Sequence, residues 1–446
     1  MFILDGKKKT PLFFIHFLVG LILWKFPFIS TYISWIIILI GSYVILKKPD
    51  PKGHFPLIFS AYIVGFEVLL RMTNARVFWE FGKYSVILFL ILGFIRNKRE
   101  KNIHFLILIY FILLLPSIFL LPLESFNQWR QSITFNLSGP ACLLISTQYL
   151  FNTKLTVDDI KNILLYSLLP IFSTAIFVIL RMPDIDTYIF VPYSNKTTSG
   201  GYGPNQVSTI FGFGIVALVY LQVMKEKSNY NQYMERYIDW ILLILFMGLG
   251  LLTFSRGGIF AAVISSSIAV SFYFFFNQRK IQFLFKSTIL LFITIITWIN
   301  IENITNGVIS ERYGFSSLEY ENKVLMDLTG RAEIYFIDME IFFDNIFTGV
   351  GPGQANHLRK YYGYSKNVAA HIEYSRMLSE HGLLGLISLF ILFGVIFHHF
   401  LIFSPRHTKF LKILFGLLSL ITMSHSAMRL AMPCFILGFI FPKYEE

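Results

Sequence analysis

Long apolar stretches alternate with short polar connections along the whole chain. A helix that spans a bilayer needs about 20 mostly apolar residues, and stretches near that length recur throughout the sequence. They lie near residues 11–24, 30–46, 55–71, 80–95, 104–121, 137–151, 162–181, 205–223, 239–254, 257–276, 283–299, 382–402, 408–423 and 427–441. This pattern predicts an all-α polytopic membrane protein with about 12–14 transmembrane helices.

Composition supports this interpretation. The 446 residues are 55% hydrophobic and only 14% charged, whereas a soluble globular protein is about 25% charged. The net charge of +12 could favour nucleic acid, but the basic residues lie in short clusters between apolar stretches. Topology signals belong at those positions, so no nucleic-acid partner is expected.

The positions of the basic clusters predict how the chain is oriented. If the N-terminus is cytoplasmic, all lysine-rich connections fall on the cytoplasmic side, as the positive-inside rule requires; they are 47–52, 96–101, 154–161, 225–236, 279–280 and 406–412. Three parts follow: transmembrane helices of the N-terminal part of the bundle (1–299), a large periplasmic loop with an amphipathic helix (300–370), and C-terminal transmembrane helices (371–446). A second outer loop covers about 182–204.

The predicted outer side carries arginines beside glycines or at helix ends: Arg71, Arg130, Arg256 and Arg331. Outer loops usually contain few basic residues, so the presence of these arginines requires an explanation. Arginine presents a planar fork of donors that suits phosphate oxygens, and it stays charged near lipid. These arginines are therefore candidates for binding an anionic ligand.

The stretch "LTFSRGGIFAAV" (252–263) predicts a short outer turn between two helices. Ser255 could cap the second helix, and Gly257 and Gly258 could let the backbone approach a ligand. A helix N-terminus beside Arg256 would favour an anion. A tight hairpin whose arginine reaches the lipid headgroups is the alternative interpretation.

The stretch 327–355 predicts an amphipathic helix opened by Arg331. Its acids (Glu333, Asp338, Glu340 and Asp344) interrupt apolar residues at helical spacing (Ile334, Ile337, Ile341 and Phe342). Such a helix would lie on the membrane surface or over a cleft. It leads into Gly349-x-Gly351-x-Gly353. A nucleotide-binding loop would need a preceding strand in a βαβ unit, so the alternative for these glycines is a helix end followed by turns.

The stretch "AAHIEYSRMLSEHGLLGL" (369–386) places ionisable residues at the start of an apolar helix. Asn367 could cap a helix beginning near Val368, with His371 in its first turn. The helix dipole would keep the imidazole neutral there, as a general base must be. A structural histidine at the membrane interface is the alternative.

Glu373 and Glu380 could orient His371 or pair with arginines. Neither lies three or four residues after His371, so pairing with it on the same helix is not expected. The histidines His357, His371 and His381 lack the spacing of a metal site. We therefore expect no metal.

The set of motifs resembles the O-antigen ligase and polymerase superfamily. "SRGG" on a membrane hairpin, "GR" opening a long outer loop, "GVGPGQA" and "AHIEYSRMLSEHGLLGL" occur in that order, and the resemblance is strongest over about 200–400. The family comprises bacterial integral membrane glycosyltransferases of the GT-C class that use undecaprenyl-diphosphate-linked glycans. The resemblance implies a multi-pass protein of the bacterial inner membrane with a periplasmic active site.

The resemblance also implies roles for individual residues. Arg256 matches the arginine of the family's SR-G motif. Arg331 matches the arginine near the start of the large periplasmic loop, and His371 matches the essential histidine at the end of that loop. Many members have a small polar residue after this histidine, where Ile372 stands here. The two arginines would clamp the diphosphate and stabilise its growing charge, and His371 would take the acceptor proton.

The expected reaction is an inverting glycosyl transfer without metal or cofactor. Its partners would be an undecaprenyl-diphosphate-linked donor, a glycan or lipid A-core acceptor, and membrane lipids. Further candidate residues for lining the cleft are Arg71, Arg130, Asn205, Gly349, Gly351, Gly353, Glu373 and Glu380.

Several functions remain open. The sequence does not separate ligase from polymerase, and a polymerase-like or broad surface-polysaccharide role is slightly favoured because no acceptor-specific feature is visible. A polysaccharide flippase or other transporter would show charged or helix-breaking residues near the bilayer midplane and repeated halves, whereas the spans are mostly clean and no convincing repeat occurs. A non-enzymatic assembly scaffold predicts no effect from replacing His371.

Overall fold

The computed structural model describes residues 9–97, 102–122, 125–185, 187–224, 231–275, 280–314, 331–364, 370–402 and 404–445. The first half contains α1 (Lys9–Lys25), α2 (Ile29–Lys47), α3 (Phe55–Met72), α4 (Phe81–Arg96), α5 (Phe105–Ile112), η1 (Pro116–Leu120), α6 (Phe126–Phe151), β1 (Lys154–Leu155), α7 (Val157–Arg181), η2 (Thr197–Ser199) and α8 (Pro204–Val223). The second half contains α9 (Asn231–Leu252), α10 (Arg256–Phe275), α11 (Lys280–Ile304), α12 (Val308–Tyr313), α13 (Arg331–Asp344), α14 (Gln354–Leu358), η3 (Arg359–Tyr362), α15 (Glu373–Leu401), α16 (Arg406–His425), α17 (Ala431–Leu437), η4 (Gly438–Ile440) and β2 (Lys443–Tyr444).

The all-helical class predicted from hydropathy is confirmed, and each predicted span falls on a helix or on a helix with its 3₁₀ extension. In the described part of the chain, six helices are long and apolar enough to cross a membrane: α2, α3, α7, α8, α10 and α15. Further apolar helices are shorter. The protein is a multi-pass membrane protein, and the number of 12–14 crossings stays a prediction.

Local sequence explains where several helices begin. Thr156 and Asp159 form a reciprocal capping box at the start of α7. Pro204 occupies the first turn of α8, where a missing N–H is tolerated. Ser125 caps α6 by accepting from the Gln128 amide, so α6 begins well before the apolar stretch near 137–151.

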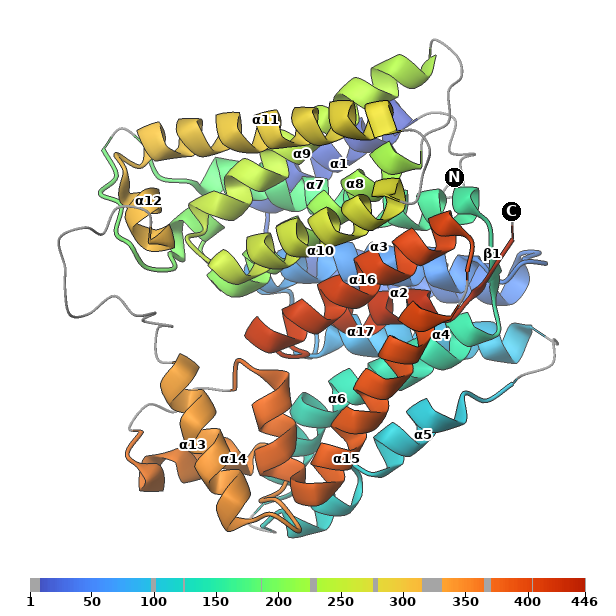
Figure 1. The fold of residues 1–446 in the computed structure, drawn as a ribbon, viewed down its shortest axis with the longest axis vertical. Coiled ribbons are helices and arrows are strands. Elements are labelled where there is room, and N and C mark those ends of the chain that lie inside the picture. The colour runs from blue at the N-terminus through green and yellow to red at the C-terminus, as the bar shows by residue number, and fades with distance from the viewer. Residues whose placement is uncertain are drawn as a thin grey trace.

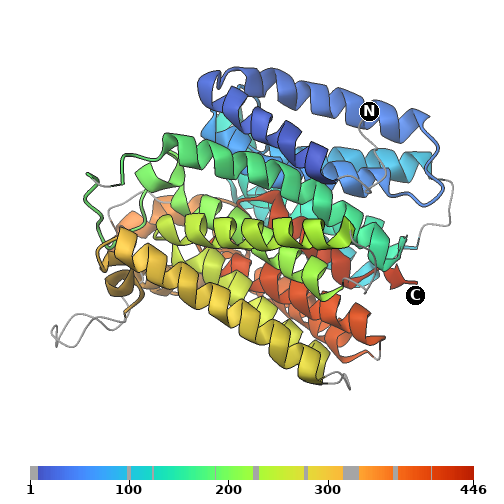
Figure 2. The same ribbon diagram turned by 90° about the horizontal axis from the view of Figure 1, so that it is seen from above.

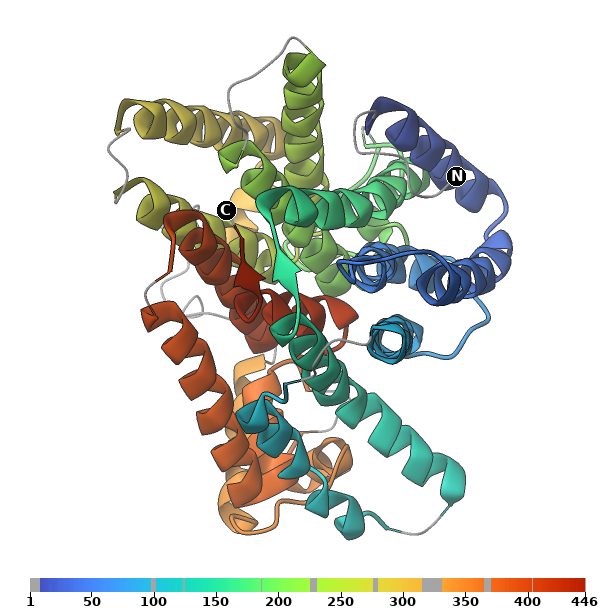
Figure 3. The ribbon, with the colours of Figure 1, turned by 90° about the vertical axis from the view of Figure 1, so that its right-hand side faces the viewer.

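Most of the long helices run side by side as one bundle (Figure 1). Seen from above, α1 and α2 (dark blue) lie at one edge and α11 (yellow) at the other (Figure 2). Seen along the bundle, α15 and α6 diverge from it, with the orange segment 331–364 between them (Figure 3). This divergence leaves room for the polar segments that precede α15.

The predicted cytoplasmic connections around 47–52 and 154–161 meet at one end of the bundle, which we call the lysine-rich end. Here β1 pairs in parallel with β2, and Asp159 lies 3.2 Å from His54 and 3.6 Å from Lys52. Because α3 begins at this end, its last turn, with Arg71, lies at the opposite end. We call that opposite end the site end.

The predicted amphipathic helix is present as α13, and it buries one of its acids together with its apolar face. Ile334, Ile337 and Ile341 are buried against Ala355 and Tyr364. Asp338 does not interrupt this face but lies within it, fully buried, with an oxygen 2.8 Å from the Arg359 guanidinium. Burial raises the pKa of Asp338, and the charge of Arg359 opposes this shift.

Asp338 also ties α13 to the membrane helix α15. Its Oδ2 accepts from the Ser375 hydroxyl at 3.0 Å. The helix is thus fixed to α15 through its buried face, and its place on the membrane surface or over a cleft stays a prediction. The segment 331–364 therefore positions the start of α15.

Candidate active site

At the site end, residues in the first turn of α8 form hydrogen bonds with residues at the start of α10 and in the last turn of α3. Asn205 Oδ1 accepts from the Ser255 hydroxyl at 2.6 Å, and Gln206 Oε1 accepts from Arg71 Nη1 at 3.0 Å. Ser255 precedes α10 and Arg71 lies in the last turn of α3. Asn205 and Arg71, two predicted cleft residues, thus belong to one hydrogen-bonded group with the SRGG hairpin.

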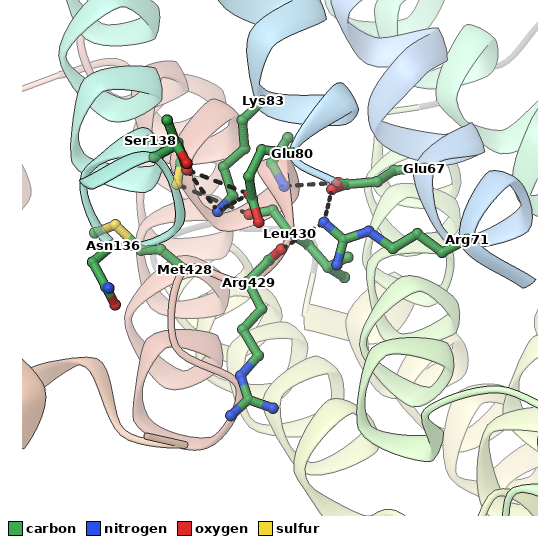
Figure 4. Close-up of polar contacts among 12 residues, drawn as sticks. Glu67, Arg71, Glu80, Lys83, Asn136, Ser138, Met428, Arg429 and Leu430 are labelled. Atoms are coloured by element: carbon green, nitrogen blue, oxygen red, sulfur yellow. Dashed lines mark hydrogen bonds and ion pairs between the residues drawn. The ribbon is translucent and has the colours of Figure 1, made fainter. Parts of the chain in front are cut away.

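Arg71 lies in a buried charged group at this end (Figure 4). Its Nη2 lies 2.7 Å from Glu67 Oε1 and 3.0 Å from the Arg429 carbonyl oxygen. The side chains of Arg71 and Glu67 are 7% and 2% exposed, and Lys83 pairs with Glu80 beside them. Buried charges are stable only when paired in this way. Arg71 is therefore held by paired contacts, and it also lines a cavity together with Glu67, Arg76 and Trp79.

The backbone next to His371 is held by Arg429, a residue the sequence analysis did not select. Arg429 Nη2 donates to the Ala370 carbonyl at 2.8 Å. A small cavity lies here, lined by Phe135, Asn136, Asn356, Ala370, Glu373, Arg376, Ala427, Met428 and Arg429. Half-buried His371 stands between two of these lining residues in the chain, Ala370 and Glu373.

The predicted start of α15 was wrong. The helix begins at Glu373, with Ile372 as its N-terminal cap at φ −108° and ψ 120°. His371 therefore lies before the helix and not in its first turn. Asn367 and Val368 fall outside the described residues. The helix dipole falls off within the first turn, so it contributes less to a neutral imidazole than predicted.

The acids Glu373 and Glu380 bind Arg376 and not His371. Arg376 Nη1 lies 2.7 Å from Glu380 Oε2, and its Nε and Nη2 donate to the two oxygens of Glu373. All three side chains are at most 7% exposed. Glu373 and Glu380 are three and four residues from Arg376, the helical spacing that favours ion pairs. This spacing could have revealed the pairing from sequence.

The glycines of GVGPGQA allow close backbone packing. Gly349, Gly351 and Gly353 have φ of 66°, 92° and 77°, in a region that side chains rarely adopt. A Cβ on Gly349 would lie 2.5 Å from the Glu380 carbonyl. The Gly351 amide donates to that carbonyl at 2.9 Å, beside a break in α15 at Gly382. These glycines therefore fix the loop against α15.

Arg256 opens α10 and remains half-buried. Its Nη1 donates to the Arg312 carbonyl at 3.2 Å. The two glycines after it serve helix packing: a Cβ on Gly257 would lie 2.5 Å from the His425 ring, and one on Gly258 would lie 2.3 Å from the Ser208 carbonyl. The expected approach to a ligand is thus occupied by α16 and α8, and the guanidinium of Arg256 remains the ligand candidate of this hairpin.

Comparison with known families adds a decisive observation. Residues 241–390 match the O-antigen ligase family. No curated protein sequence matches the chain. The family match confirms the resemblance drawn from the motifs, and it covers about a third of the chain.

The O-antigen ligase region contains Arg256, Arg331 and His371, whereas Arg71, Asn205 and Arg429 lie outside it. Arg331 opens α13, but its side chain falls outside the described residues. Arg130, also outside the region, is exposed on α6 and lies near Tyr84 of α4. Among the described residues, no hydrogen bond or ion pair joins Arg130 to Arg71 or its partners.

The sequence predicts no metal site. Within the described ranges, no three or more histidine, cysteine or acidic side chains gather closely enough to hold a metal ion. The side chains that line the cavity next to Ala370 include guanidinium, carboxylate and amide groups.

Proposed function

We propose that this protein is a membrane glycosyltransferase of the O-antigen ligase and polymerase type. It would transfer a glycan from undecaprenyl diphosphate to a hydroxyl of a glycan or of lipid A-core during surface-polysaccharide biosynthesis. The observation that carries the proposal is the family match over residues 241–390, because this range includes both His371 and the Arg256 hairpin. The contacts at the site end support it by linking the Arg256 hairpin to the neighbourhood of His371.

The reaction we propose breaks the bond between the sugar C1 and the phosphate oxygen. The acceptor oxygen attacks C1 from the opposite face, and its proton passes to a ring nitrogen of His371. Undecaprenyl diphosphate leaves with the bonding electron pair, so the anomeric centre is inverted. Arg256 and Arg331 would stabilise the negative charge that develops on the diphosphate.

The contacts of Glu373 and Glu380 support the assignment of His371 as the base. Arg376 occupies both Glu373 and Glu380, so these acids are structural and His371 is the base candidate in its segment. The Arg429–Ala370 hydrogen bond restrains the backbone beside His371. Holding donor and acceptor in a fixed geometry at such a site accounts for much of the rate of a two-substrate reaction.

We also propose that the protein lies in the bacterial inner membrane with its site end facing the periplasm. Two lysine-bearing connections, 47–52 and 154–161, meet at the opposite, lysine-rich end, and the positive-inside rule expects such connections to be cytoplasmic. A lipid-linked donor anchored in the outer leaflet would reach the site end directly.

The buried charges give little support to the alternative function as a transporter. Glu67 with Arg71, Glu80 with Lys83 and the Arg376 triad are buried ion pairs, and intramembrane charges often mark transport paths. However, Arg71 ends α3, Lys83 begins α4 and Glu373 begins α15. The pairs thus gather at helix ends near the site and not at mid-bundle, which favours an interfacial active site.

The direct test complements a strain lacking the gene with wild type, His371→Ala or His357→Ala. His357 is an exposed histidine of α14 and serves as the matched control. Lipopolysaccharide and lipid-linked glycans are separated by gel at equal membrane levels of each variant. We expect His371→Ala to lower transfer by about 100- to 10,000-fold and His357→Ala to restore the normal pattern.

The pattern left by His371→Ala also separates the two activities. Long chains stranded on undecaprenyl diphosphate would indicate a ligase, and single repeat units on lipid A-core would indicate a polymerase. A normal ladder from folded His371→Ala protein would overturn the assignment of the base.

A further inference from the structure

We propose that the cavity beside the loop between α3 and α4 binds one sugar ring of the glycan substrate, which stacks on the indole of Trp79. This inference rests on the proposed function, because the ligand is part of a glycan that the protein would transfer or extend. The loop, residues 73–80, lies outside the region matched by the O-antigen ligase family, and none of its residues was a candidate in the sequence analysis.

The cavity lies at the site end, where α3 ends and α4 begins. Its volume is about 280 Å³, whereas the cavity next to Ala370 has about 20 Å³. A water molecule needs about 10–15 Å³ of such space. The smaller cavity therefore has room for about one water, and the larger one has room for a molecule of many non-hydrogen atoms, such as a sugar ring.

The walls of this cavity combine aromatic rings with polar groups. Phe78 and Trp79 line it, and so do Asn74 and Arg76. Asn74 and Arg76 are exposed, and neither side chain forms a hydrogen bond or ion pair with another residue in the described part of the chain. Small-molecule sites have this composition, in which apolar and aromatic walls supply affinity and a few polar groups fix the orientation of the ligand.

This composition suits a sugar better than the other ligands of a membrane surface. One face of a pyranose ring presents C–H groups, which suit the negative face of an aromatic ring, while its hydroxyls bind amide and guanidinium groups. An acyl chain would leave the polar groups without partners. A phosphate would meet, among the described lining residues, one uncompensated cation, Arg76, because Arg71 is paired with Glu67.

Trp79 provides the surface for stacking. Its side chain is 59% exposed, and the guanidinium of Arg71 lies 5.2 Å from the centre of its ring. A cation at this distance attracts the ring by a cation–π interaction and so restrains its orientation. Because a single guanidinium covers at most one face of the indole, the other face remains for a ligand.

The loop that carries Trp79 has a defined shape. Asn74 has φ 50°, a left-handed conformation that persists where the surrounding structure holds it. The Arg76 amide donates to the Thr31 hydroxyl of α2 at 2.9 Å, and buried Glu80 forms an ion pair with a lysine of α4. These contacts fix the backbone on both sides of Trp79. A surface ordered in advance loses little conformational entropy when a ligand binds.

Arg71 links the cavity to the proposed reaction centre. Its Nη1 donates to Gln206, and its Nη2 donates to the Arg429 carbonyl; Figure 4 shows it beside Glu67. Gln206 follows Asn205, which binds the hairpin of Arg256. A sugar ring some way along the glycan from the reacting bond would therefore lie in this cavity while the reaction takes place. Binding of such a remote ring lowers KM.

The test measures sugar binding to the purified full-length protein in lipid nanodiscs. The probe is the repeat-unit oligosaccharide released by mild acid from the undecaprenyl carrier of the same strain, so it has neither lipid nor diphosphate. Saturation-transfer NMR identifies the ring protons that contact the protein, and titration gives the affinity. We expect saturation on one face of a sugar ring, about a 10-fold loss of affinity in Trp79→Ala, and a smaller loss in Trp79→Phe, which keeps an aromatic face.

The matched control is Trp24→Ala, because tryptophans also anchor proteins at the membrane interface. Trp24 is 43% exposed in the last turn of α1. Contacts show that α1 and α7 run in the same direction: Phe13 meets Phe172, His16 meets Ser173 and Gly20 meets Ile176. Trp24 therefore lies at the site end, as Trp79 does, but of these two indoles only Trp79 lines the cavity. Trp24→Ala should bind like wild type, and a loss equal to that of Trp79→Ala would overturn the proposal.

Failure of this subsite and failure of the proposed function are distinguishable. Glycan transfer by wild type is measured in the same nanodiscs with a lipid-linked glycan. If wild type transfers glycan but binds the oligosaccharide no better than Trp79→Ala does, the proposed function stands and the subsite is overturned. If wild type neither transfers the glycan nor binds the oligosaccharide, the proposed function fails and the subsite fails with it.

Kinetics separate a binding role of Trp79 from a structural one. A contact that is equal in the ground state and the transition state affects KM and leaves kcat nearly unchanged. We expect Trp79→Ala to raise the KM of the donor or of the acceptor about 10-fold, and the substrate affected is the one whose sugar occupies the cavity. A fall in kcat at unchanged KM would overturn the binding role. If Trp79→Ala does not fold, Arg76→Gln takes its place, with a smaller expected rise in KM.

Discussion

Two groups of arginines at the site end have different surroundings. Arg376 and Arg359 are buried and held by carboxylates of α15 and α13. Arg256 and Arg429 are half-buried, and each donates to a backbone carbonyl, that of Arg312 or Ala370. A buried ion pair fixes structure, whereas a guanidinium bound to a neutral carbonyl can exchange it for a charged phosphate at a gain. We propose that this difference separates the structural arginines from Arg256, the ligand candidate.

The largest expected effect is that of Arg376→Gln. It leaves Glu373 and Glu380 as buried acids without their cation, which costs about 3–5 kcal/mol. We expect little folded protein in the membrane, measured by fluorescence-detected gel filtration of a tagged protein. Normal folding and stability of this variant would break the comparison, because Arg376 would then not be structural.

Arg256→Gln should lower the rate of transfer and leave folding unchanged, the opposite of what we expect for Arg376→Gln. Loss of one donor to a developing negative charge costs about 2.7–4 kcal/mol of transition-state stabilisation, or 100- to 1,000-fold in rate. Membrane levels and the gel-filtration profile should stay normal, since Arg256 gives up only one hydrogen bond to a carbonyl. Transfer is measured with a lipid-linked donor in vitro, and full activity would remove Arg256 from the ligand-binding group.

A smaller effect is expected where the glycine loop packs on α15. Gly349→Ala forces a side chain onto a backbone at φ 66° with its Cβ 2.5 Å from the Glu380 carbonyl. The conformation alone costs about 1–2 kcal/mol, so the thermal midpoint should fall. The control is Gly394→Ala on α15, where a Cβ meets nothing within 4 Å; it should be neutral or slightly stabilising.

The smallest effect should come from Arg130→Gln. The side chain is exposed on α6, and exposed charges contribute about 0–1 kcal/mol. We expect transfer activity within about 5-fold of wild type. A loss as large as that of Arg256→Gln would place Arg130 with the ligand-binding arginines after all.

Hydropathy and charge patterns predicted the helices and the segregation of basic loops, and the family resemblance pointed to Arg256 and His371. These signals are local: an apolar stretch must span the bilayer wherever it packs, and short motifs keep their spacing. The ion pairs of Arg376 were also within reach of the sequence, because its two acids lie at helical spacing. The start of α15 was misplaced because a favourable cap residue only suggests where a helix can begin.

Contacts between distant segments could not be predicted from one sequence. Glu67 binds the amide of Ala431, 364 residues away, and Arg429 reaches Ala370 across 59 residues. The glycines of both motifs suggested a ligand, yet they meet the backbones and rings of neighbouring helices. The sequence by itself determined the helices, and it predicted their orientation in the membrane and the base candidate. Only the tertiary structure decided which arginines are held in ion pairs and which donate to backbone carbonyls, because burial and partners depend on how the helices pack.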